Sequence, residues 1–170
     1  MLRAHSAIAD DPALWREIER GIAAADALVG LVPGIGHMQH MPSHIYFPLG
    51  MWDEASAINE RSMKAADERR AAKKLAVDAR GFHAMLWLVY GYAQQGRFED
   101  SRALLAQLEA DAKASGSVRT RSHLALARAA WLIESRKWGE AKTPVAAQDL
   151  GVDAAIAELF AVGMAGIRSG

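Results

Sequence analysis

Hydrophobic positions recur along the chain with the period of an α-helix, in long blocks that short polar breaks separate. Residues 83–95 and 122–136 are apolar on most sides, which is typical of buried helices. Residues 98–114 are amphipathic, with their leucines gathered on one face. Residues 13–30 and 153–168 have the same helical periodicity near the two ends. The pattern therefore predicts an all-α protein.

A short phrase is repeated at the breaks between these blocks. It reads LGMWDEA at 49–55, QGRFEDS at 95–101 and SRKWGEA at 135–141. In each copy an aromatic residue can fill the gap between two helices, and a small residue three places later lets their backbones approach closely. The aromatic residues are Trp52, Phe98 and Trp138, and the small residues are Ala55, Ser101 and Ala141. Each phrase therefore predicts a tight turn between paired helices.

This combination resembles the tetratricopeptide repeat family, whose unit is two antiparallel helices of about 34 residues. In that family a glycine lies two places before the aromatic residue, as Gly50 lies before Trp52. The second copy keeps the glycine, whereas the third has Arg136 in its place. The motif HMPSHI at 40–45 also resembles sequences in a group of bacterial tetratricopeptide proteins. The resemblance implies a right-handed α–α superhelix of about three helix–turn–helix repeats with unpaired terminal helices.

The helical pattern extends over residues 1–170, which we expect to form one domain and to be a fragment of a longer solenoid. Residues 13–30 are expected to be a second helix without a complete partner, and residues 153–168 a first helix with none after it. Phe160 and Ile167, with Met164 between them, then lie on an uncovered apolar face. Such a face predicts either a homo-oligomer through the terminal helices or a larger protein.

Charge and composition narrow the range of partners. The 20 basic and 20 acidic residues balance, so bulk electrostatics predict neither nucleic acid nor a membrane as a partner. The chain has no cysteine, which excludes disulfides and thiolate chemistry and fits a cytoplasmic location. No apolar run approaches the ~20 residues that span a bilayer. The charged stretch 69–80 predicts an exposed extension of the preceding helix.

The histidines follow the repeat. His37, His83 and His123 each lie thirteen residues before the turn position of their unit, at 50, 96 and 136. The resemblance implies that this position, and those three and seven residues further on, face the concave inner surface. The expected ligand groove therefore comprises His37, His40, His44, Phe47, His83, Leu86, Tyr90, Gln94, His123, Leu126 and Glu134.

Three of these histidines also suggest a metal site. His37, His40 and His44 have the spacing i, i+3 and i+7, which places them on one face of a regular helix. Neutral imidazole binds zinc, nickel or copper well. Pro42 either bends this helix or marks its first turn, and in the second case His37 and His40 lie on the preceding loop. The alternative is that all three line the groove and bond backbone carbonyls without a metal.

We expect the groove to be the functional surface of the protein. A helical solenoid usually grips an extended segment of another protein, so the first hypothesis is a protein- or peptide-binding module with no cofactor. The sequence has no HExxH motif, Ser-His-Asp combination or paired carboxylates, and it predicts no enzyme. The rival hypotheses are a zinc- or nickel-dependent protein or hydrolase that uses His37, His40 and His44, and a self-associating structural fragment.

Overall fold

The computed structural model describes residues 11–142, 145 and 149–169, and every regular element in these ranges is helical. This confirms the all-α prediction for the described part of the chain. The elements in chain order are α2 (Pro12–Leu31), α3 (Gly36–His40), α4 (Ser43–Tyr46), α5 (Trp52–Ala72), the 3₁₀ helix η1 (Val77–Ala79), α6 (Phe82–Gln94), α7 (Phe98–Ser115), α8 (Val118–Ser135), the 3₁₀ helix η2 (Trp138–Lys142) and α9 (Val152–Ser169).

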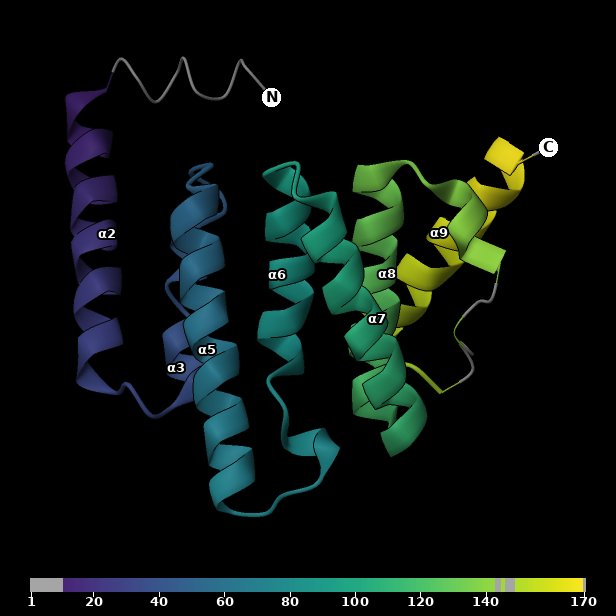
Figure 1. The fold of residues 1–170 in the computed structure, drawn as a ribbon. Coiled ribbons are helices and arrows are strands. Elements are labelled where there is room, and N and C mark those ends of the chain that lie inside the picture. The colour runs from purple at the N-terminus through teal and green to yellow at the C-terminus, as the bar shows by residue number, and fades with distance from the viewer. Residues whose placement is uncertain (1–10, 143–144, 146–148, 170) are drawn as a thin grey trace.

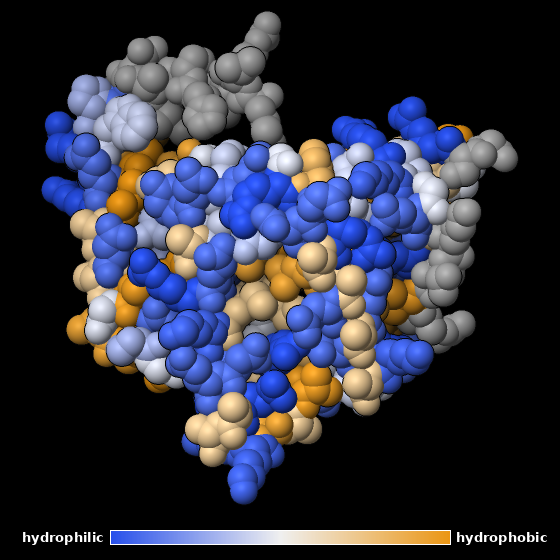
Figure 2. Space-filling model, in the orientation of Figure 1, coloured by the Kyte–Doolittle hydropathy of each residue, from blue (hydrophilic) through white to orange (hydrophobic). Residues whose placement is uncertain are grey.

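The long helices stand side by side, from α2 at one edge of the molecule to α9 at the other (Figure 1). Helix α6 packs against α5, α7 and α8, and α9 packs against α8. The main core lies between α6, α7 and α8 around Phe82, Leu108 and Trp131. A smaller core joins α2 to α4 and α5 around Tyr46 and Ile58. Figure 2 shows the face on which α5 and α7 lie in front, and it is largely hydrophilic with small hydrophobic patches.

Each of the three repeated phrases contains one left-handed residue at its turn. Gly50 and Gly96 both have φ +73°, and Arg136 has φ +60°, so all three residues have a left-handed backbone conformation. Glycine adopts this conformation without strain, which explains its place in the first two copies. In these two copies the following N–H closes the turn on a tyrosine carbonyl, from Met51 to Tyr46 at 3.0 Å and from Arg97 to Tyr92 at 2.8 Å. The predicted turns between paired helices are therefore confirmed for the first two copies, and the third shares only the left-handed residue, without glycine.

The small residues lie where the helices touch. Ala55 and Ser101 are fully buried, and Ala141 is also buried. The Ser101 hydroxyl donates a hydrogen bond of 2.7 Å to the carbonyl of Val89, which ties α7 to α6. A larger side chain at these positions would push the paired helices apart.

The third unit departs from the predicted pairing. After its turn, the short 3₁₀ helix η2 ends at Lys142, whereas α5 and α7 are full-length second helices. Helix α9 packs on α8 and η2 in the remaining space.

Helix α9 leaves apolar side chains uncovered within the described part of the chain. The fraction exposed is 53% for Phe160 and 77% for Ile167, whereas Met164 is only partly exposed. The expectation of an uncovered apolar face is met by the first two residues. Among the helices described here, none has the length and apolar character needed to cross a bilayer.

A close approach between α3 and α5 fixes the start of the histidine-bearing segment. The Ser62 hydroxyl donates a 2.7 Å hydrogen bond to the carbonyl of Gly36, and a Cβ at Gly36 would lie 2.8 Å from the Ser62 carbonyl oxygen. We expect Gly36→Ala to lower the free energy of unfolding by about 1–3 kcal/mol, because backbone must move to relieve the overlap. Urea unfolding followed by circular dichroism measures this. Gly34→Ala is the matched control, since a Cβ there meets nothing within 4 Å; equal midpoints for the two variants would contradict the contact.

Candidate functional site

The histidines from different units meet on one face. The ring centroids of His37 and His83 are 6.3 Å apart, and those of His83 and His123 are 5.9 Å apart. Phe47 and Tyr90 lie next to each other on the same face, with centroids 5.7 Å apart. These five of the residues expected to line the groove are therefore neighbours in space, His37 and Phe47 in one unit with His83 and Tyr90 in the next, and His83 with His123.

The chain keeps helical backbone angles across Pro42, between the short helices α3 and α4. Helix α3 begins at Gly36, and both Met41 and Pro42 have right-handed helical backbone angles. The N–H of Met41 donates to the carbonyl of His37 at 3.2 Å, and α4 follows directly after Pro42. Of the two alternatives for Pro42, the one in which the helix begins there is wrong, because His37 and His40 already lie on α3 and not on a loop. His40 and His44 keep a common face, with 3.0 Å between their Nε2 atoms.

His40 is held in one tautomer by its neighbours. Only 1% of its surface is exposed, and its Nδ1 lies 2.6 Å from Oδ1 of Asn59. The Asn59 amide nitrogen donates to the carbonyl of Ala55 at 2.7 Å, which fixes the amide with its oxygen toward His40. Nδ1 of His40 therefore carries the proton, because an amide oxygen only accepts. The lone pair of the ring is on Nε2, which faces His44.

His83 completes a compact histidine group. One ring nitrogen each of His40, His44 and His83 lie within 4.8 Å of one another. The indole N–H of Trp87 donates to Nε2 of His83 at 3.3 Å, so that nitrogen is also unprotonated. We call these three residues the histidine triad.

His37 lies beside the histidine triad and is not part of it. Its ring centroid is 6.0 Å from that of His40, and its side chain is exposed. The i, i+3, i+7 spacing predicted a metal set of His37, His40 and His44, whereas the structure groups the last two with His83 from α6. The sequence offered His83 only as a groove residue, because which residue of another helix approaches His40 depends on packing.

Burial keeps two imidazoles of the triad neutral. Desolvation lowers the pKa of His40 to about 4, against the raising effect of its bond to Asn59, and nearby His44 and His37 lower it further. Desolvation also lowers the pKa of His83 to about 4, helped by the neighbouring His40 and His123. Burial lowers the pKa of His123 in spite of its 2.8 Å bond to the carbonyl of Arg119. Neutral imidazole is the form that binds metal ions.

A cavity of about 650 Å³ adjoins the triad. It lies between the start of α3, the second half of α5, the start of α6 and Arg119 in the first turn of α8. All of its ionisable lining residues are basic, and we call it the basic cavity; they are His37, His40, His83, Arg69, Lys73, Arg80 and Arg119. Of the predicted groove residues, only the three histidines line this cavity.

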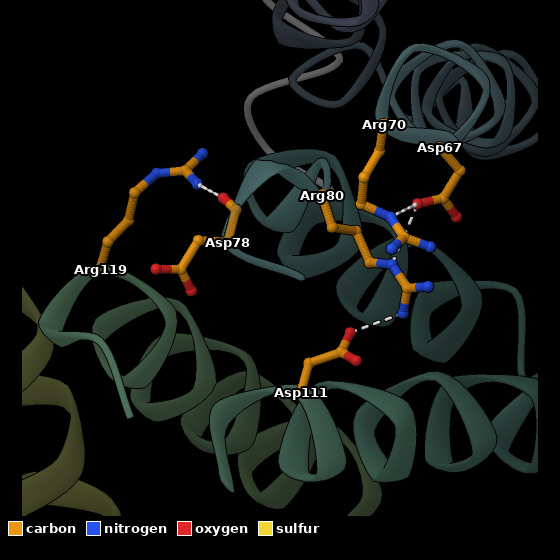
Figure 3. Close-up of polar contacts among 6 residues, drawn as sticks. All are labelled: Asp67, Arg70, Asp78, Arg80, Asp111 and Arg119. Carbon is orange, nitrogen blue, oxygen red and sulfur yellow. Dashed lines mark hydrogen bonds and ion pairs between the residues drawn. The ribbon is translucent and has the colours of Figure 1, made fainter. Parts of the chain in front are cut away.

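Arg80 anchors the loop that forms one wall of the basic cavity (Figure 3). Its guanidinium forms ion pairs with Asp67 at 3.0 Å and Asp111 at 2.6 Å, and these carboxylates outweigh burial and raise the pKa of Arg80. The extension of the preceding helix predicted for 69–80 is wrong beyond Ala72. Lys74 is left-handed with φ +52°, and the chain turns there toward η1 and Arg80.

Three other cations of the basic cavity have no carboxylate partner among the described residues. Arg69, Lys73 and Arg119 form no ion pair in this part of the chain. Arg119 donates instead to the backbone carbonyl of Asp78 at 2.6 Å (Figure 3). Sequence reasoning missed this group, because its members come from two segments far apart in a chain of zero net charge, the end of α5 and the start of α8.

Comparison with known families, characterised proteins and solved structures finds no match to this chain. The candidate site is therefore interpreted from its own geometry and chemistry.

Proposed function

We propose that this chain is a protein-binding module of the tetratricopeptide type, and that it binds an acidic segment of a partner at the basic cavity. The proposal includes a right-handed superhelical stacking of the helix pairs, with the histidine-bearing helices on the inner side. It is supported by the repeated left-handed turns at Gly50, Gly96 and Arg136 and by the row of His37, His83 and His123.

The observation that carries this function is the charge of the cavity lining. None of the ionisable side chains that line the basic cavity is acidic, and three of them, Arg69, Lys73 and Arg119, are cations without a carboxylate partner among the described residues. Acidic and basic residues are nevertheless equal in number in the whole chain. The start of α6 adds to this field, because Gly81 provides no side-chain cap for its first N–H groups. A volume of about 650 Å³ is in the range of ligand pockets and accommodates a few residues of an extended peptide.

Charge reversal at the rim tests the proposal. We expect Arg69→Glu to weaken binding of a fluorescein-labelled Asp/Glu-rich peptide by roughly five- to tenfold, because an attraction of about 1 kcal/mol becomes a repulsion. Fluorescence anisotropy measures the dissociation constant, and wild-type affinity should fall as salt is added.

The matched control is Lys64→Glu on the same helix. Lys64 is exposed, pairs with Glu68 and does not line the basic cavity, so its reversal should change affinity by less than about twofold. A Gln/Asn-rich peptide of the same length should bind much more weakly than the acidic one. Equal affinity for the two peptides, or equal effects of the two variants, would refute the assignment of the basic cavity.

A further inference from the structure

We propose that the histidine triad, His40, His44 and His83, binds a divalent first-row transition metal beside the basic cavity, with Zn²⁺ as the best match. This inference goes beyond peptide binding and does not depend on it. It concerns a different set of atoms, the imidazole nitrogens at the wall of the cavity.

The spacing of the nitrogens fits a metal. Two ligands of a tetrahedral zinc ion with bonds of ~2.0–2.1 Å lie ~3.3 Å apart. The Nε2 atoms of His40 and His44 are already 3.0 Å apart, and the whole triad lies within 4.8 Å. Small side-chain rotations of His44, which is exposed, and of His83, which is half-buried, bring the three nitrogens to that distance.

Hydrogen-bond partners of the triad leave the lone pair on Nε2 in both His40 and His83. Asn59 Oδ1 accepts a hydrogen bond from the protonated Nδ1 of His40, which leaves Nε2 as the ligand atom. A hydrogen bond from the second ring nitrogen of a ligand histidine to a fixed acceptor is the usual outer-shell partner in metal sites. The indole N–H of Trp87 donates a long hydrogen bond of 3.3 Å to the unprotonated Nε2 of His83. Rotation of the His83 ring can break this bond and direct Nε2 toward a metal ion. His44 is exposed and can change tautomer freely.

The donor set selects the metal and its remaining ligand. Three imidazoles favour zinc, nickel or copper over magnesium and calcium, which prefer oxygen ligands. No carboxylate belongs to the group, so a divalent ion keeps its charge and requires a water, a hydroxide or an anion as a further ligand. His40 and His83 both line the basic cavity, so the cations of that cavity lie next to the triad and can attract such an anion.

The test uses the full chain without a histidine tag, freed of metal with EDTA and titrated with Zn²⁺ and with Co²⁺. We expect one equivalent to bind by native mass spectrometry, with the visible absorption of a tetrahedral centre for Co²⁺. His44→Ala and His83→Gln should weaken binding by about a hundredfold or more. His44 is exposed, so its loss leaves the fold intact, as circular dichroism would verify.

His37→Ala is the matched control, because His37 lines the same cavity and lies outside the triad. The Zn²⁺ affinity of His37→Ala should stay within about twofold of that of the wild-type protein. Less than a tenth of an equivalent bound by wild type, or equal losses in His37→Ala and His44→Ala, would overturn the metal site. The acidic-peptide measurement with metal-free protein distinguishes the two proposals, since it reports on Arg69 and does not require the triad.

Discussion

Glu158→Leu is expected to lower the free energy of unfolding by about 3–5 kcal/mol. Glu158 and Arg128 are almost completely buried, at 1% and 5% exposed, and their side chains meet at 2.5 Å between α9 and α8. Glu158 also accepts a 2.9 Å hydrogen bond from the N–H of Val145. Removing the carboxylate leaves the Arg128 charge buried without a partner, and this cost dominates the effect.

The double variant Arg128→Met/Glu158→Leu separates charge from packing. It removes both charges and replaces them with apolar side chains of similar size, so most of the lost stability should return. Urea unfolding followed by circular dichroism gives the free energies for the cycle. If the double variant is as unstable as the sum of the two single variants, the Arg128–Glu158 pair is not the reason for the loss.

Arg80→Met is expected to destabilise the fold by about 2–4 kcal/mol. Arg80 is the common partner of Asp67 on α5 and Asp111 on α7, and the Arg80 and Asp111 side chains are only 13% and 11% exposed. Without the guanidinium, the Asp111 carboxylate remains buried without its partner. The free energy of unfolding in urea measures the loss.

Arg70→Met provides the comparison for Arg80. Arg70 contacts the same Asp67 carboxylate at 3.5 Å, with 30% of its own side chain exposed. A partly exposed ion pair contributes little to stability, so the free energy of unfolding of Arg70→Met should stay within about 0.5 kcal/mol of wild type. Equal losses for Arg70→Met and Arg80→Met would mean that burial of the Arg80 network does not matter.

The histidine triad could be predicted only in part from the sequence. Two of the three triad members, His40 and His44, were recognisable as a pair because a spacing of four keeps them together across Pro42. His83 could be placed on the same face only through the repeat. The third ligand is thus a consequence of how α6 packs beside α3 and α4, and local spacing favoured His37 instead.

The basic cavity could not be predicted from the local sequence. Arg69 and Lys73 belong to a charged stretch that is typical of a solvated helix, and Arg119 lies in the first turn of α8. Their approach depends on where α5 ends and on the left-handed turn at Lys74, which brings the next segment back toward the core. A net charge of zero conceals this local separation of charge.

The sequence by itself determined most of the helices and the turns between them, because periodicity, glycine at left-handed turn positions and small contact residues act over a few positions. The tertiary structure decided which helix ends meet, which imidazole joins His40 and His44, and which cations face one cavity. These depend on helix packing and on burial of the ion pairs of Arg80 and Arg128, and such contacts between distant residues have no local signature in the chain.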